Sequence, residues 1–286
     1  MNYIYQNPSL TPMERTLNLL SLMTLEEKVG QMMQISYSMV NPTEAEEWVS
    51  KKFSGSFLHV LGDNADHLQE LALSTRLGIP LIFGIDAIHG HGLLNGATIF
   101  PSQLAMSCSF NTELIEKAGR VTAREVAADG LHWTFSPVLC IGRDIRWGRI
   151  DETFGEDPYL IGILASAIIK GYQGENLSDP NSILACAKHY LAYGESTGAK
   201  DAYDTEVTVR KIREVFLPPF KKAVEVGCAT FMTGYQSIDG TPMAANKKML
   251  KGILKDELGF EGFVVTDWNN TGSLVSNQRE IGRAHV

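Results

Sequence analysis

Several predicted strands in this sequence end in polar residues that could act together on one ligand. The endings are Asp86, the segment 143–149, Lys188 with His189, Tyr235, and Asp267. Where parallel strands close into a barrel, their C-terminal ends open on one face, so these side chains would ring a single pocket. A lone aspartate after a strand, such as Asp267 after the apolar run 263–266, more often caps the next helix. The convergence of five endings favours a functional site.

Lys188 and His189 lie side by side in the apolar stretch 184–190. Both could be structural, the histidine satisfied by backbone groups and the lysine paired with a carboxylate. Burying a cation is costly unless partners or a ligand compensate, and this favours a functional role for the pair. Adjacent residues of an ideal strand point to opposite faces, so both side chains can reach one ligand only if the strand twists or bulges.

The segment 143–149 carries three arginines around Trp147, and Glu152 follows closely. It could be a solvated loop of local ion pairs, each of which contributes little. The density of arginines and acids favours bidentate pairs that leave one guanidinium for ligand hydroxyls. The pair Asp157-Pro158 is typical of a helix start.

Charged donors and acceptors beside an aromatic ring suit a neutral polyhydroxy ligand. The residues that supply this combination are Asp86, Arg149, Lys188, His189 and Trp268. A metal site is disfavoured, because His89 and His91 stand two apart with no matching Cys or carboxylate pattern. We expect no metal and no other cofactor.

The elements that must position these residues alternate between strand and helix. Seven strands are predicted, at 31–36, 55–61, 80–86, 132–139, 182–190, 228–235 and the run that ends at Asp267. The alternation indicates a parallel α/β architecture. A closed (β/α)8 barrel of TIM type needs eight units, so we expect such a barrel, incomplete at its C-terminal end. An open doubly wound sheet is the alternative, but no glycine-rich phosphate turn follows the first strand.

Capping signals mark where the helices begin. The spacing T-x-x-E occurs at Thr24 and again at Thr43, and we predict that both threonines cap helices. The other predicted caps are Asp63 or Asn64, Asn111, and Asn246. A helix over 208–227 should be kinked at Pro218-Pro219.

Composition excludes several classes of function. The chain has 286 residues, of which 44% are hydrophobic, and a formal net charge of −8. The negative charge argues against a nucleic-acid or anionic-membrane partner. Residues 1–10 do not read as a signal peptide, no apolar run is long enough to span a bilayer, and the four cysteines are scattered singly, as in reduced buried thiols. We expect a cytoplasmic protein.

Five motifs in register resemble glycoside hydrolase family 3. They are the segments 84–90 (GIDAIHG), 96–101 (GATIFP), 143–149 (RDIRWGR), 187–189 (AKH) and 262–268 (GFVVTDW). The resemblance runs from about Met13 to Trp268. Any one of these motifs alone would be a weak signal.

The resemblance implies a retaining, exo-acting β-glycosidase, above all a β-glucosidase that removes terminal non-reducing glucose. It implies that Asp267 is the nucleophile that forms a covalent glycosyl-enzyme. The residues that it implies around the innermost sugar are Asp86, Arg149, Lys188 and His189, with Tyr235, Trp268 and Met232 lining the site. The ligand would be a small-molecule or oligosaccharide β-glucoside.

The resemblance also leaves alternatives open. A β-xylosidase would share these motifs, and a non-catalytic barrel could bind sugar in the same pocket without hydrolysing it. The β-N-acetylglucosaminidases of the family carry a Pro-Gly-His type continuation after the Lys-His pair. Here the sequence continues from Tyr190 to Gly194 as YLAYG, which disfavours that branch.

We interpret residues 1–279 as a truncated N-terminal barrel domain and residues 280–286 as a non-native tail. In the family, the usual acid/base is a glutamate on a second, α/β-sandwich domain, which we expect in the full-length protein. Neither Glu257 nor Glu261 is a persuasive substitute, because both precede the final strand. We therefore expect the chain alone to be inactive or weakly active.

Overall fold

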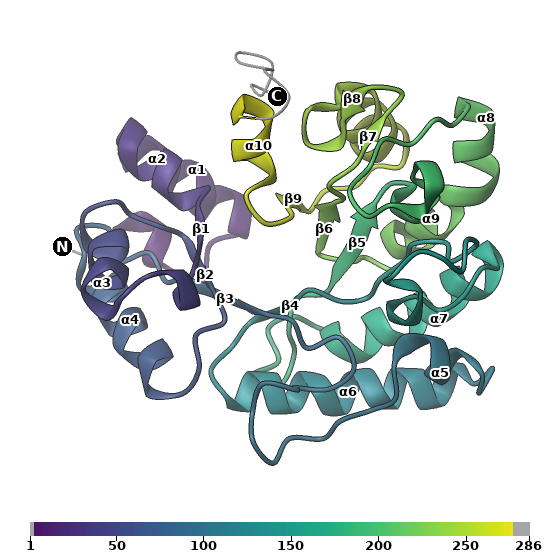
Figure 1. Ribbon diagram of the computed structural model, residues 1–286. Coiled ribbons are helices and arrows are strands. Elements are labelled where there is room, and N and C mark those ends of the chain that lie inside the picture. The colour runs from purple at the N-terminus through teal and green to yellow at the C-terminus, as the bar shows by residue number, and fades with distance from the viewer. Residues whose placement is uncertain (1–2, 277–286) are drawn as a thin grey trace. The chain divides into compact units, whose positions relative to one another are not determined.

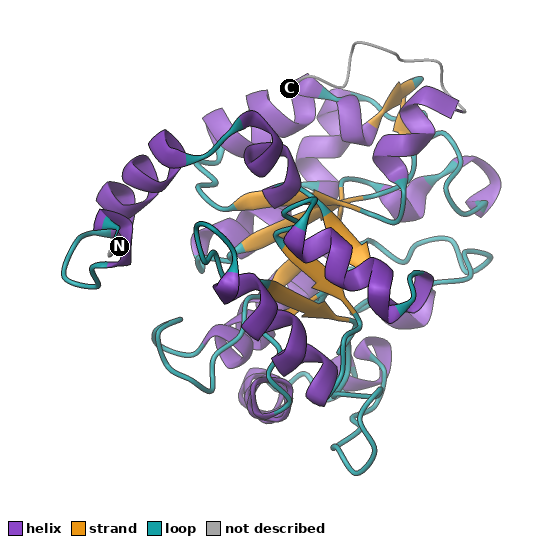
Figure 2. Cartoon of the chain, turned by 90° about the vertical axis from the view of Figure 1, so that its left-hand side faces the viewer, coloured by secondary structure: helices purple, strands orange, loops and turns teal. Residues whose placement is uncertain are grey.

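The computed structural model describes residues 3–276, and the chain divides into two compact units, Met1–Gly84 and Ile85–Val286 (Figure 1). The segment 280–286, interpreted above as a non-native tail, lies outside the described residues. In both units helices and loops connect the strands, which Figure 2 distinguishes by colour.

The first unit alternates helices with short parallel strands. Its elements are η1 (Ile4–Gln6), α1 (Pro12–Leu22), α2 (Leu25–Gln31), β1 (Gln34–Ser36), η2 (Tyr37–Met39), α3 (Pro42–Ser50), β2 (Ser56–Leu58), α4 (Asp63–Ser74) and β3 (Ile82–Ile85), whose last residue belongs to the second unit. β2 pairs in parallel with both β1 and β3. The three strands predicted in this region are confirmed, each shorter than its prediction.

The helix starts of the first unit test the capping predictions. Thr24 caps α2 as predicted, since its hydroxyl accepts from the backbone N–H of Glu27 at 3.2 Å. The prediction for Thr43 was wrong, because Asn41 caps α3 and Pro42, whose fixed φ suits the first helical position, starts the helix two residues earlier. The predictions for Asp63 and Asn64 were also wrong. Gly62 holds the cap position of α4, without a side-chain hydrogen bond.

The second unit carries all the residues predicted to form the site. Its helices are α5 (Gln103–Ser107), α6 (Thr112–Ala128), η3 (Ile150–Glu152), α7 (Pro158–Gln173), η4 (Tyr193–Glu195), η5 (Thr197–Ala199), α8 (Val209–Lys211), η6 (Ile212–Phe216), α9 (Pro218–Glu225), η7 (Met243–Ala245), η8 (Lys248–Glu257) and α10 (Asn270–Ser276). Its strands are β4 (Trp133–Thr134), β5 (Cys186–Tyr190), β6 (Thr230–Thr233), β7 (Ser237–Ile238), β8 (Thr241–Pro242) and β9 (Phe263–Thr266).

A ladder of parallel strands places the strand ends of this unit side by side. β5 pairs with β6, and β6 pairs with β9, all in parallel (Figure 1). A parallel bridge between Trp133 and Leu184 joins β4 to the residues before β5. β9 is the edge strand of its sheet, so Phe263 is 44% exposed and the rest of the strand is half-buried. The apolar run 263–266, whose composition is that of a buried strand, is therefore not buried within the described residues.

The strand prediction for 132–139 was too long, and one short hairpin was missed. β4 covers only Trp133–Thr134 of the predicted 132–139, because Pro137 cannot donate to a ladder. β7 and β8 form an antiparallel hairpin that was not predicted. Two residues are too few to leave a hydrophobic pattern in the sequence.

The helices of the second unit follow their capping signals more closely. Asn111 caps α6 and Asp157 caps α7, and the side chain of Asn246 accepts from the N–H of Met249 at the start of η8. The predicted helix 208–227 is broken into α8, a π-helical turn over Ile212–Phe216, and α9, which begins at Pro218. The helical segment therefore changes at Leu217, directly before Pro218-Pro219, where a kink was predicted.

Large aromatic side chains are part of the core of the second unit. The largest buried side chains of the second unit include Trp133, Trp147, Tyr172 and Phe231. Within residues 3–276, no helix is both long enough and apolar enough to cross a bilayer. The four cysteines are free thiols, three of them buried and Cys108 exposed.

Candidate functional site

Asp267 lies directly after β9, at the C-terminal end of the strand. Its side chain is only 8% exposed, and one carboxylate oxygen accepts from the backbone N–H of Trp268 at 2.8 Å. Burial raises the pKa of this carboxyl, while that hydrogen bond and the positive charges of Lys188 and Arg149 oppose the rise. The carboxylate does not bond to an N–H of α10, which starts at Asn270, so the helix-cap interpretation of its side chain fails.

The side chains of Lys188 and His189 both point into the same site, although they are neighbours in β5. The register between β5 and β6 shifts between Ala187 and Tyr190, which is the irregularity that two adjacent residues need in order to share a face. Lys188 Nζ lies 3.1 Å from Asp86 Oδ1, and His189 Nε2 lies 3.5 Å from Asp267 Oδ2. The bulge therefore brings two strand ends into one cluster.

His189 is neutral in this cluster. It is 1% exposed, and burial lowers its pKa well below the ordinary value, an effect that the nearby charges of Lys188 and Arg149 strengthen. Its contact with Asp267 is consequently a polar contact and not an ion pair.

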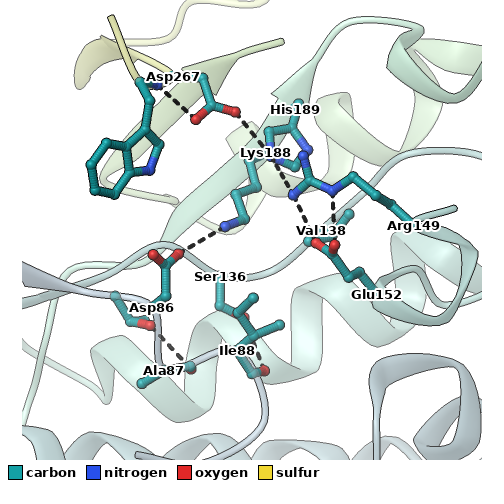
Figure 3. A network of polar contacts seen from close by, with 12 residues as sticks. Asp86, Ala87, Ile88, Ser136, Val138, Arg149, Glu152, Lys188, His189 and Asp267 are labelled. Carbon is teal, nitrogen blue, oxygen red and sulfur yellow. Dashed lines mark hydrogen bonds and ion pairs between the residues drawn. The ribbon is translucent and has the colours of Figure 1, made fainter. Parts of the chain in front are cut away.

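Arg149 extends the cluster from the loop after β4. Its guanidinium forms two hydrogen bonds of 2.8 Å with the carboxylate of Glu152, and its second terminal nitrogen lies 3.2 Å from His189 Nε2. Burial alone would lower the pKa of Arg149, because it disfavours the charged form. The hydrogen bonds to Glu152 outweigh this effect and raise the pKa above its ordinary value. The dashed contacts of Figure 3 lead from Asp86 to Lys188, and from Asp267 through His189 and Arg149 to Glu152.

The three residues predicted to line the site differ in their contacts with the cluster. Burial, together with the nearby carboxylate of Asp267, raises the pKa of the half-buried Tyr235 hydroxyl. Trp268 is 42% exposed and contacts Asp267 through its backbone. Met232 is buried in β6, where it pairs with Val265 of β9, and none of the polar contacts of the cluster involves it.

Three residues of this site were not among the predicted site residues, although Glu152 was named in the segment where bidentate pairs were predicted. Tyr193 packs its ring 5.0 Å from that of His189 and 6.3 Å from that of Tyr235, with the Arg149 guanidinium 5.5 Å from its centre. Cys140 touches His189, and Glu152 holds Arg149. Glu152 could have been found from its i,i+3 spacing to Arg149. No local pattern distinguishes Tyr193 or Cys140 from other core residues.

The arrangement suits binding of hydroxyl groups. Three carboxylates, two cationic side chains and one neutral imidazole converge here. Lys188 pairs with Asp86 and Arg149 with Glu152, whereas the nearest side-chain partner of Asp267 is the neutral His189. Such groups can donate to or accept from the hydroxyls of a ligand. Among residues 3–276, no group of three or more His, Cys, Asp or Glu side chains could hold a metal ion.

Comparisons with known proteins agree with one another. The family model described as the glycosyl hydrolase family 3 N terminal domain matches residues 24–285. A periplasmic beta-glucosidase of Salmonella typhimurium is 34% identical over 96% of this chain and 36% of its own length. A beta-xylosidase of Formosa agariphila is 37% identical over 81% of this chain and 34% of its own length.

Solved structures give the same result. A beta-glucosidase involved in saponin metabolism from intestinal bacteria superposes with a TM-score of 0.84 at 49% identity, covering 92% of this chain and 34% of that one. The beta-glucosidase of Listeria innocua in complex with glucose superposes with a TM-score of 0.85 at 33% identity, covering 93% of this chain and 39% of that one.

This chain spans a little over a third of the length of such relatives. Its fold is that of their N-terminal domain, a TIM-barrel-like α/β fold, and the parallel strands with their many helices are consistent with an incomplete barrel. By its family model, its relatives and its fold, the chain belongs to glycosyl hydrolase family 3.

Proposed function

We propose that this chain is the sugar-binding and nucleophile-bearing part of a retaining, exo-acting β-glycosidase that removes terminal non-reducing β-D-glucosyl residues. The observation that carries the proposal is the buried carboxylate of Asp267, 3.5 Å from the neutral His189. A carboxylate without a bound cation of its own, beside groups that bind hydroxyls, can attack an anomeric carbon.

The surrounding residues fix the sugar. Lys188 and Asp86 offer a donor and an acceptor 3.1 Å apart, the spacing that a pair of neighbouring sugar hydroxyls can bridge. Arg149 and His189 bind hydroxyls closer to Asp267. Tyr235, Trp268 and Met232 line the site, and the exposed indole of Trp268 offers an apolar face to a ring.

The reaction takes two steps. The carboxylate of Asp267 attacks the anomeric carbon, the bond to the leaving oxygen breaks, and that oxygen takes a proton from an acid. A water, deprotonated by the same group, then displaces Asp267 and releases the sugar with its configuration retained. Retaining enzymes need the two carboxyl groups about 5 Å apart.

We propose that the second carboxyl group comes from outside residues 3–276. Of the acids in the cluster, Asp86 is paired with Lys188 and Glu152 with Arg149. Glu257 forms a two-point ion pair with Arg213, and Glu261 precedes β9, at the end opposite Asp267. Relatives of the chain are nearly three times as long, which leaves room for another domain to supply the acid.

A mechanism-based inhibitor tests this function without the acid. In 2,4-dinitrophenyl 2-deoxy-2-fluoro-β-D-glucoside the leaving group departs unprotonated, and the fluorine slows hydrolysis of the covalent intermediate. We expect the purified chain to become labelled once, on the peptide that contains Asp267, as read by mass spectrometry. Aryl glucosides with poor leaving groups should be turned over far more slowly than by a full-length relative.

Controls separate the alternatives. Asp267→Asn should abolish labelling while largely preserving affinity for glucose, because it removes the negative charge and keeps the shape. Glucose binding without labelling of the wild type would support a non-catalytic sugar-binding barrel. Faster labelling by the corresponding fluoroxyloside would support a β-xylosidase, the name carried by one of the relatives above.

A further inference from the structure

The thiol of Cys140, in the loop after β4, makes three contacts with His189. Its Sγ accepts from the backbone N–H of His189 at 3.3 Å, lies 3.6 Å from the ring nitrogen Nδ1, and lies 4.0 Å from the carbonyl oxygen of His189. Cys140 is 2% exposed and sits in the cluster formed with Val138, Trp147, Tyr193 and Ala199. The thiol therefore cannot serve a ligand directly, but every polar group of His189 except Nε2 faces it.

The hydrogens of Arg149 decide which ring nitrogen of His189 carries the proton. The second terminal nitrogen of Arg149 has two hydrogens, of which one goes to Glu152 Oε2 at 2.8 Å and the other faces His189 Nε2 at 3.2 Å. An arginine is always protonated and cannot accept, so Nε2 is the acceptor of this contact. Nε2 also lies 3.5 Å from Asp267 Oδ2, a contact that would favour a proton on Nε2, but it is longer than the contact with Arg149. In a neutral ring the proton then sits on Nδ1, which faces Cys140 Sγ.

We propose that Cys140 is a positioning residue that holds His189 in the Nδ1–H tautomer, with its Nε2 lone pair turned toward Arg149, the guanidinium of the proposed sugar site. A thiol has one weak donor and can accept more than one hydrogen bond. Here it accepts from the backbone N–H and from Nδ1–H, and its own hydrogen is directed at the His189 carbonyl. The three groups of His189 are satisfied by one side chain.

A thiol does this without adding a charge beside Asp267. Burial raises the pKa of Cys140 to about 12, so the group stays protonated at neutral pH. An aspartate in its place would draw a proton onto His189 and change the charge balance of the site. Sulfur also accepts at longer distances than oxygen, which fits contacts of 3.3 and 3.6 Å.

The tautomer can be read directly from the wild-type chain without sugar and without activity. In an imidazole labelled with ¹⁵N, protonated and unprotonated nitrogens have well-separated chemical shifts, and comparison with His189→Gln assigns the signal. We expect His189 to show a protonated Nδ1 and an unprotonated Nε2, unchanged between pH 5 and 8. An Nε2–H tautomer, or a ring that becomes charged in this range, would overturn the proposal.

Variants then test the role of the sulfur. Cys140→Ala should shift the His189 signals toward a mixture of tautomers, and Cys140→Ser should retain most of the wild-type pattern. Cys228→Ala removes another buried thiol, which contacts the Thr230 carbonyl, and should leave the His189 signals unchanged. Wild-type signals in a folded Cys140→Ala chain would contradict the proposal, and if that variant does not fold, the wild-type spectrum and Cys140→Ser still decide.

Sugar affinity gives a second readout, which rests on the function proposed above. We expect Cys140→Ala to weaken glucose binding about tenfold, and Cys140→Ser to restore most of it, since a net hydrogen bond is worth about that factor. If the wild type does not bind glucose, the sugar proposal fails while the tautomer result stands. If it binds glucose and Cys140→Ala binds equally well, the positioning role fails.

Discussion

The ammonium of Lys188 lies 3.1 Å from the carboxylate of Asp86, although 102 residues separate them in the sequence. Lys188 is 4% exposed and the Asp86 side chain is 31% exposed, so one partner is buried while the other reaches solvent. The pair joins the end of β3 to that of β5. Asp86 is therefore the more accessible partner of the pair.

Replacing Lys188 with methionine should lower the free energy of unfolding by about 2 kcal/mol, below the range for a fully buried pair because Asp86 is partly solvated. The double variant Lys188→Met with Asp86→Asn should recover part of the loss, since no unpaired charge remains. Urea unfolding measures both. The exposed pair Lys117 and Glu113 provides a control in which Lys117→Met should change little. Equal stability of Lys188→Met and wild type would contradict the burial of this charge pair.

Asp267 should make the chain less stable as pH rises. Burial places its pKa above the ordinary value, so the folded chain binds more protons than the unfolded chain between the two pKa values. Stability falls as pH rises through this window, and the loss is complete above the folded pKa. Asp267→Asn should therefore be more stable than wild type at pH 7, by a margin that shrinks as pH falls to 4. Chemical unfolding at both pH values measures the margin.

Asp144 provides the opposite case for comparison. Hydrogen bonds from Arg146 lower its pKa to about 2, so its contribution to stability is present at neutral pH and is lost as pH falls through that value. Asp144→Asn should lower stability slightly at pH 7.

For Asp267, a stability margin of Asp267→Asn over wild type that grows as pH falls would contradict the prediction. It would show that the Asp267 carboxylate is stabilised by its neighbours and not penalised by burial.

The strand ends of this site could be predicted because apolar runs followed by charged residues are a local pattern. Asp86, Lys188, His189 and Asp267 each follow or close such a run, and parallel strands bring their ends together. The sequence also indicated that β5 must twist or bulge if Lys188 and His189 are to share one ligand. It could not place that bulge between Ala187 and Tyr190, because the register depends on the partner strand.

The remaining members of the site depend on contacts between distant segments. Cys140 and Tyr193 are core residues by composition, and only the packing of two loops against each other brings them to His189. The predicted caps of α3 and α4 were wrong for a local reason. A proline at the first helical position and a glycine with positive φ determined the starts of these helices in place of the nearest polar residue.

Glu152 should matter to sugar binding although it need not touch sugar. Its carboxylate holds two nitrogens of Arg149 and so fixes the orientation of the guanidinium. Glu152→Gln keeps the shape but loses the charge-assisted bonds, and we expect glucose affinity to fall about tenfold, measured by calorimetric titration. Arg146→Lys changes an exposed arginine that pairs with Asp144 and should leave affinity unchanged. Equal losses in the two variants would indicate a general electrostatic effect and not positioning of Arg149.

The close packing of α6 on α7 depends on glycine at position 171. A Cβ added to Gly171 would lie 2.3 Å from the carbonyl oxygen of Glu116 and 3.0 Å from the Cα of Gly119, so the two helix backbones would have to separate. Gly171→Ala should therefore lower the free energy of unfolding by about 2 kcal/mol, as overpacking does elsewhere. Gly252 is exposed in η8 with open space around it, and Gly252→Ala should raise stability by about 0.5–1 kcal/mol through helix propensity alone. Thermal or urea unfolding of the two variants compares the effects, and a stabilising Gly171→Ala would mean that α6 and α7 do not approach this closely in solution.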